Sequence, residues 1–142
     1  LPYQHPDAFD FLIELERHYS FSRILNVGDI FDHHRGSYHE SETDAYGEEE
    51  EYYRASEDAH LLQSIFPSMR ITRGNHDDIP VRKAKTVGLP VSMLHDTNKL
   101  YGLNKSWRWE DQYWFDTWGA YPIVVPMVLN KRGRWDKGIL AI

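Results

Sequence analysis

The amino-acid sequence predicts an α/β protein in which parallel strands are joined by a helix. Two short apolar runs, residues 24–27 and 69–72, suit buried strands. Apolar residues recur at helical spacing before the first run, over residues 7–19, and between the two runs, over residues 48–66. Because parallel neighbours need a crossover connection, this order indicates a small β-sheet with flanking helices.

The remaining segments predict one long loop and three further elements. Residues 29–47 show no periodicity and indicate a loop, of a length that favours a functional role in a compact domain. Residues 79–87 suit a basic helix that Gly88 ends, and a shorter helix is expected within residues 91–103. Residues 121–129 contain two prolines, which limit them to an edge strand.

Composition and charge indicate one domain with an uneven surface. The 142 residues suit a single hydrophobic core, so we expect one domain over residues 1–142. The chain has no cysteine, so any metal must be held by His, Asp, Glu, Asn or backbone oxygen. The net charge is −6, and residues 37–58 carry nine acidic side chains against Arg54 alone. Without a leader or an apolar stretch long enough to span a bilayer, we expect a cytoplasmic protein without a membrane partner.

Polar side chains of the metal-ligand type follow both predicted strands at the point where each strand ends. Gly28-Asp29 follows the first strand, and Gly74-Asn75-His76 follows the second. In open α/β sheets the ligand crevice lies outside the C-terminal ends of the strands. A glycine, having no Cβ, lets backbone and ligand approach closely. The two motifs together predict a metal site at the C-terminal ends of the strands.

The motifs GDIFD and GNHD resemble two signatures of the calcineurin-like metallophosphoesterases. The resemblance implies that Asp29 bridges two metal ions and that Asn75 binds the second one. It also implies that His76 is catalytic, acting near the leaving group, and that Asp77 orients it. The implied cofactors are two divalent metal ions, Mn²⁺ first, with Fe, Zn or Mg as alternatives. The implied reaction is hydrolysis of a phosphate ester, either a small ester or a nucleic acid, by a metal-activated water.

Three further residues near the motifs are candidates for contact with a ligand or the substrate. Asp32 either orients a ligand or caps the loop, and both alternatives stay open. His34 is a candidate whose ring nitrogen would bind a metal or a phosphate. Arg73, the first residue of the second ligand loop, is a candidate for substrate contact. Over residues 1–95 the chain resembles phosphoesterases that are commonly found in bacteriophage genomes.

Some motifs of the family have no counterpart here. Family members begin with a strand that ends in Asp-x-His, and a lone His and a Gly-His-x-His later complete both metal sites. After His76 this chain has only His95, so we expect an incomplete domain with little turnover of its own, whose parent is an enzyme. The alternative function is a non-catalytic interaction module that keeps the phosphoesterase scaffold and uses the aromatic-rich stretch from Trp107 onward. The sequence does not specify an oligomeric state.

Overall fold

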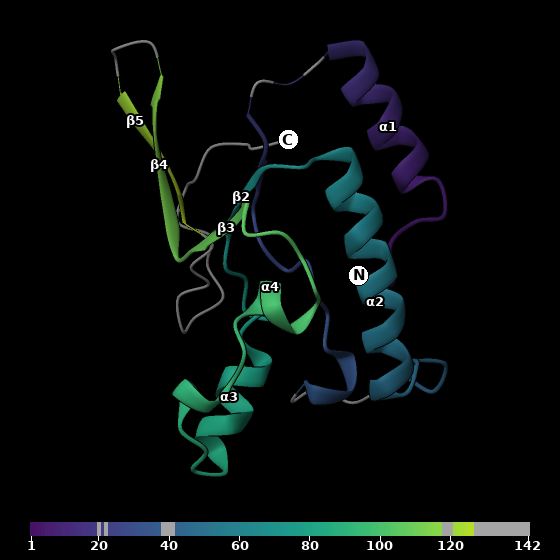
Figure 1. The fold of residues 1–142 in the computed structure, drawn as a ribbon, viewed down its shortest axis with the longest axis vertical. Helices are drawn as coiled ribbons and strands as arrows, with labels where there is room; N and C mark the ends of the chain where they lie inside the picture. Colours follow the sequence, from purple (N-terminus) through teal and green to yellow (C-terminus); the bar gives the residue numbers. More distant parts are fainter. Residues whose placement is uncertain (20, 22, 38–41, 118–120, 127–142) are drawn as a thin grey trace.

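The protein is α/β, as the sequence predicts, and its main sheet has three parallel strands (Figure 1). The computed structural model describes residues 1–19, 21, 23–37, 42–117 and 121–126, the last two strands by their backbone alone. The strand order is β1 (Leu25–Asn26), β2 (Met69–Thr72) and β3 (Trp107–Glu110), with the central strand pairing on both edges. Strand β1 is shorter than the predicted run 24–27, whereas β2 has the predicted bounds.

The helices lie where the periodicity predicts them. Helix α1 (Ala8–Tyr19) and the crossover helix α2 (Glu48–Ile65) pack side by side along the sheet, and α3 (Ile79–Thr86) lies at the bottom of Figure 1. The predicted helix within residues 91–103 is two short pieces, the 3₁₀ turn η2 (Val91–Met93) and α4 (Thr97–Leu100). The long loop contains one more 3₁₀ turn, η1 (His34–Gly36).

The third parallel strand, β3, was not anticipated from the sequence. It pairs with β2 in register from Met69 opposite Trp107 to Thr72 opposite Glu110. The side chain of Trp107 is 1% exposed, and its indole N–H donates to the carbonyl of Phe66 at 2.9 Å. The alternation of tryptophan with charged residues in WRWE has the period of two expected of a strand. That alternation was the signal that could have revealed the strand.

The chain continues into an antiparallel hairpin of β4 (Gln112–Thr117) and β5 (Tyr121–Pro126). The predicted edge strand 121–129 corresponds to β5, which belongs to a separate two-stranded sheet and ends at the second proline. Residues 127–129 of that prediction lie outside the described residues. The side chains of the aromatic-rich stretch are described only as far as residue 111, so the interaction surface expected there is left as a hypothesis.

The hydrophobic core lies between the sheet, α2 and the segment after β1. The rings of Phe31 and Tyr101 stack with their centroids 3.7 Å apart and their planes 2° apart. The buried core residues come from the segment after β1, from α2, β2 and β3 and from the residues after α4: Ile30, Phe31, Ala55, Ala59, Leu62, Phe66, Met69, Ile71, Tyr101, Leu103 and Trp107. The start of the expected loop 29–47 is therefore part of the core. This burial holds the residues on either side of Ile30 and Phe31 in fixed positions at the sheet edge.

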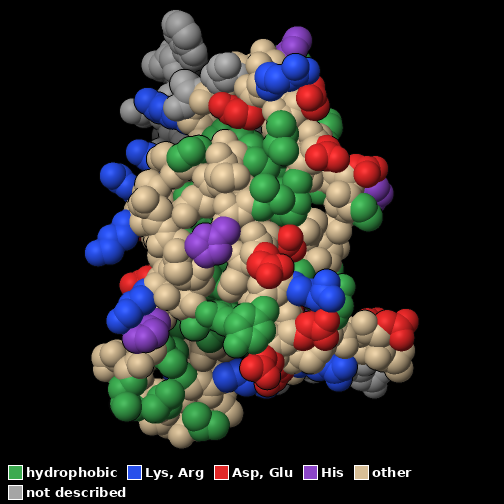
Figure 2. Space-filling view, turned by 45° about the vertical axis from the view of Figure 1, so that its right-hand side comes forward, with side chains coloured by type: hydrophobic (Ala, Val, Ile, Leu, Met, Phe, Trp, Pro, Cys, Tyr) green, Lys and Arg blue, Asp and Glu red, His purple; other side chains and the backbone are tan. Residues whose placement is uncertain are grey.

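The outer face formed by α1 and α2 is mixed in character. Figure 2 turns this side forward and shows hydrophobic and acidic side chains interspersed on it. Phe11 and Tyr19 of α1 are more than half exposed, and Glu48, Glu49 and Glu50 in the first turn of α2 are exposed as well. Among the described residues, no helix combines the length and the apolar character needed to cross a bilayer.

Candidate functional site

The residues that follow β1 and β2 meet at one edge of the sheet, because the two strands run parallel and in register. Asp29 adopts a left-handed backbone conformation with φ 54°, and Gly28 before it has φ 102°. The chain therefore turns sharply as it leaves β1. The turn directs the Asp29 carboxylate toward the loop after β2, since one of its oxygens accepts the backbone N–H of His76 at 3.0 Å.

Two glycines allow the loops after β1 and β2 to touch. A Cβ on Gly28 would lie 2.6 Å from the carbonyl oxygen of Thr72 and 2.7 Å from the nitrogen of Gly74. A Cβ on Gly74 would lie 2.1 Å from a carboxylate oxygen of Asp29. No side chain fits at either position without movement of the backbone. The glycines of the two motifs are thus required for the close approach of the loops.

Asp77 ties the two loops together. Its carboxylate accepts the backbone N–H of Asp29 at 2.9 Å, of Phe31 at 3.1 Å and of Gly74 at 2.9 Å. The side chain is buried, and this burial raises the pKa of Asp77, while the three N–H donors oppose the rise. These contacts direct both oxygens of its carboxylate to backbone donors, and the expectation that Asp77 orients His76 stays a prediction.

Asp32 orients the ring of His76. The ring Nδ1 lies 2.8 Å from a carboxylate oxygen of Asp32 and 2.7 Å from its backbone carbonyl oxygen. Both partners are acceptors, so Nδ1 carries a proton and the second ring nitrogen, Nε2, is left for a ligand. Asp32 thus contacts the residue that the resemblance makes catalytic, and its two alternatives, orienting a ligand or capping the loop, stay open. We call Asp32 and His76 the dyad.

The other two candidate residues lie on either side of the dyad. A ring nitrogen of His34 lies 3.6 Å from the second oxygen of Asp32, and its other nitrogen accepts the N–H of Glu42 at 3.0 Å. His34 thus flanks the dyad. Arg73 lies 3.8 Å from Asp78 and 3.9 Å from Asp111. These ion pairs hold its guanidinium between the two acidic side chains.

The donor set fits part of a metal site. Asp29 is held against the loop that carries Asn75, and a carboxylate and an amide oxygen are ligand types that hard cations prefer. Within the ranges that the structure describes, no group of three or more His, Asp or Glu residues is placed to hold a metal ion. The centre of two divalent ions that the resemblance implies stays a prediction.

His33 belongs to the site and was not selected from the sequence. It has φ 51°, a left-handed conformation, and its ring nitrogen Nε2 lies 3.4 Å from the hydroxyl of Tyr101. Burial lowers the pKa of His33 to about 4, with Asp32 opposing the shift. The ring is therefore neutral at pH 7. Its neighbour Glu51 is buried and accepts the backbone N–H of His34, which ties η1 to α2.

Comparison of the chain with protein-family models, curated proteins and solved structures finds no match. The resemblance to the metallophosphoesterases thus depends on the motifs and on the site geometry described above.

The close approach of the loops predicts that Gly74→Ala destabilises the protein by about 1–3 kcal/mol, because the new methyl overlaps the Asp29 carboxylate. Gly47→Ala is the matched control, since a Cβ there meets nothing within 4 Å. Urea unfolding of both variants measures the difference. Equal stabilities of the two variants would contradict the contact between Gly74 and Asp29.

His33 predicts a loss of stability in acid. Its pKa is lower in the folded state, about 4, than in the unfolded chain, about 6.5, so its contribution is complete above pH 6.5 and falls as the pH drops toward 4. Between pH 7.5 and pH 5 this loss amounts to about 2 kcal/mol. Asn tolerates the left-handed backbone, so His33→Asn should fold. Between these two pH values its free energy of unfolding, measured with urea, should fall by about 2 kcal/mol less than that of the wild type. Parallel losses in the two proteins would contradict the prediction.

Proposed function

We propose that the chain belongs to a metal-dependent phosphoesterase that hydrolyses phosphate esters. The observation that carries the proposal is the dyad, placed at the C-terminal ends of two parallel strands beside Asp29. A His that donates a proton and is held by a carboxylate, next to oxygen ligands of a cation, suits phosphate-ester hydrolysis. The α/β fold is compatible with this function but does not establish it.

The proposed role of His76 is to stabilise the leaving group. Asp32 holds Nδ1 of the ring through its carboxylate and its carbonyl, so the ring cannot rotate and Nε2 keeps one direction. A hydrogen bond or a proton from Nε2 to the ester oxygen lowers the cost of its departure as an alkoxide. Since Nδ1 already carries a proton, Nε2 donates only when it carries a second proton as well.

Asp29 and Asn75 are the residues that would hold a divalent cation in this proposal. When bound, such a cation neutralises charge on the phosphate and activates a water. The contribution of the chain itself is placement: the N–H of His76 fixes one oxygen of Asp29, and the Asp77 contacts fix the backbone on both sides of it. We propose Mn²⁺ as the first metal to test.

The charge around the site favours a small phosphate ester over a nucleic acid. Glu48 is exposed next to the buried Glu51, and both line the cavity that also contains His33, the residue after Asp32. A polyanion that lay across the site would be repelled by the acidic first turn of α2, whereas a single phosphate group at the strand ends would not have to cross it.

The dyad predicts a loss of hydrolysis in His76→Ala and Asp32→Asn variants. With 4-nitrophenyl phosphate, its diester and single-stranded DNA as substrates and Mn²⁺ present, we expect kcat/KM of the full-length protein to fall about 10²–10⁴-fold in His76→Ala. The fall in Asp32→Asn should be smaller, about 10–100-fold, since the ring is retained. His18→Ala, on the exposed end of α1, is the control. Absence of Mn²⁺-dependent hydrolysis of all three substrates would contradict the proposed function and leave the non-catalytic module.

Metal binding gives a test that does not depend on turnover. Calorimetric titration of Mn²⁺ at pH 7.5 should give a binding heat with the wild-type chain, because Asp29 and Asn75 lie on adjoining loops. The heat should be lost in the Asp29→Ala, Asn75→Ala double variant and after addition of a chelator, and it should be kept in Asp10→Ala on α1. Equal heats in the double variant and the wild type would place the metal elsewhere.

A further inference from the structure

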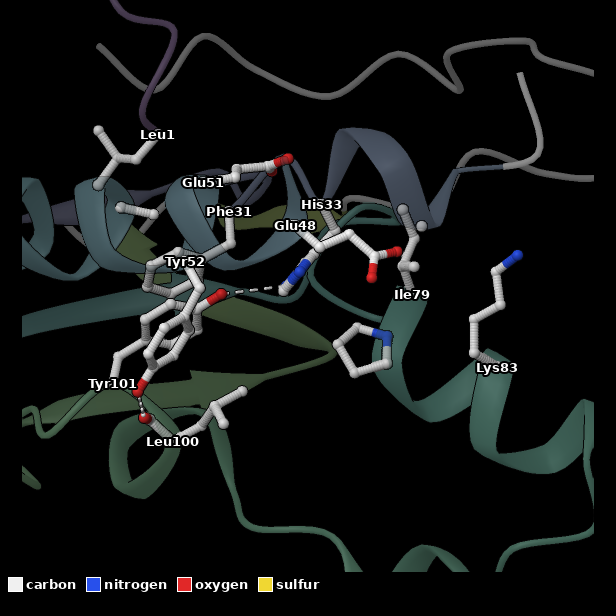
Figure 3. Close-up of a pocket in the computed structure, with 13 residues that line it drawn as sticks. Leu1, Phe31, His33, Glu48, Glu51, Tyr52, Ile79, Lys83, Leu100 and Tyr101 are labelled. Atoms are coloured by element: carbon white, nitrogen blue, oxygen red, sulfur yellow. Dashed lines mark hydrogen bonds between the residues drawn. The ribbon is translucent and has the colours of Figure 1, made fainter. Parts of the chain in front are cut away.

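A cavity of 210 Å³ lies beside the dyad, between α2, α3, η1 and α4. In the close-up of Figure 3, Tyr52 and Tyr101 lie on one side of it, and Ile79 and Lys83 lie on the other. His33 lies between the two sides, and Leu100 lies near the two tyrosines. The cavity is not part of the site proposed to hold the metal and phosphate.

The aromatic side of the cavity is held in place by contacts outside it. Tyr101 stacks on the buried ring of Phe31, and the hydroxyl of Tyr52 donates to the carbonyl of Leu100 at 2.8 Å. The rings of Tyr52 and Tyr101 also contact each other, with centroids 5.3 Å apart. These side chains cannot collapse into the space without breaking those contacts. The cavity is therefore formed in the absence of a ligand, as small-molecule sites usually are.

The polar groups of the cavity include hydrogen-bond acceptors on Glu48 and His33 and the donor ammonium of Lys83. Glu48 is exposed at the start of α2 and offers carboxylate oxygens. His33 is neutral at pH 7 because burial lowers its pKa, so its ring has one nitrogen that accepts a hydrogen bond. Most of the remaining lining is carbon from aromatic, aliphatic and proline side chains. A ligand that fits has an apolar body and at least one N–H or O–H donor.

The cavity adjoins the dyad through the chain itself. His33 directly follows Asp32, and Ile79 begins α3 three residues after His76. A Cβ on Gly36 would lie 2.9 Å from the Cγ2 of Ile79, so η1 and α3 approach each other closely beside the cavity. A group bound in the cavity can therefore be joined by a short ester link to a phosphate at the strand ends.

The volume limits the size of that group. A cavity of about 150 Å³ is large enough to bind benzene. A cavity of 210 Å³ accommodates one ring with one or two substituents, and it is too small for a chain of nucleotides. We propose that the cavity binds the leaving group of the phosphate ester, and that this group is a single planar ring carrying a hydrogen-bond donor. The inference rests on the function proposed above.

Direct binding of ring compounds tests the inference without turnover. Phenol and cytidine represent the two sources of such a ring, a phenolic ester and a pyrimidine nucleotide, and cyclohexanol is a non-planar control of similar size. We expect phenol or cytidine to shift the NMR signals of Tyr52, Tyr101 and Ile79 in the wild-type chain, and the one that binds more tightly identifies the source. Equal binding of cyclohexanol, or no binding of either ring, would overturn the inference.

Matched variants locate the binding. Glu48→Gln weakens the acceptor without changing its size, so the dissociation constant of the ring should rise about tenfold. Glu49→Gln, one residue along the same exposed turn, should leave it unchanged. Leu100→Trp should fill the space and abolish binding, with circular dichroism to show that the variant is folded. An equal effect of the two glutamate variants, or binding kept in folded Leu100→Trp, would place the ring elsewhere.

Hydrolysis rates separate this inference from the proposed function. For the full-length protein with Mn²⁺, we expect kcat/KM for a phenyl or cytidine phosphate to exceed that for methyl phosphate at least tenfold, and the difference to shrink in Glu48→Gln. Ring binding without any hydrolysis would leave the cavity assignment standing and contradict the phosphoesterase. Hydrolysis of methyl and ring esters at equal rates, without ring binding, would support the phosphoesterase and contradict the cavity assignment.

Discussion

The arrangement of this site depends on the buried carboxylate of Asp77. It accepts three backbone N–H groups, two from the segment after β1 and one from the loop after β2. Loops that leave neighbouring strands have no ladder hydrogen bonds to hold them together, and their buried N–H groups need acceptors. One carboxylate meets this need for both loops. Loss of Asp77 would leave three donors without partners and would separate Asp29 from the loop of Asn75.

The dyad follows from this clamp and from the hydrophobic core. Ile30 and Phe31 are buried, so the backbone between Asp29 and Asp32 has little freedom. Asp32 then lies beside His76, and its carboxylate and its backbone carbonyl both contact Nδ1 of that ring. The apolar pair inside GDIFD thus positions the two carboxylates on either side of it. The Asp29 carboxylate is directed to the loop after β2, and the Asp32 carboxylate to the ring of His76.

The same segment connects the site to the neighbouring cavity. Phe31 supports Tyr101 from behind, and His33 contacts the hydroxyl of Tyr101. A change that moved the residues after β1 would alter the dyad and the aromatic wall together. If the cavity holds a leaving group as proposed, substrate size and protonation of the leaving oxygen depend on one short stretch of chain, from Asp29 to His33. Such coupling between binding and catalysis raises selectivity without added residues.

The sequence by itself determined the α/β class, the crossover helix α2, the strand β2 and the glycine-carboxylate motifs, because apolar periodicity and glycine placement are local properties. It did not determine which acid orients His76. Asp77 is adjacent in sequence and Asp32 is not, yet the parallel pairing of β1 and β2 brings Asp32 to the ring and turns Asp77 toward the backbone. The burial of His33 and Glu51 likewise came from α2 packing over the loop after β1. Contacts between residues far apart in the chain are decided by tertiary packing. A single sequence shows which residue types are present but not which of them are in contact.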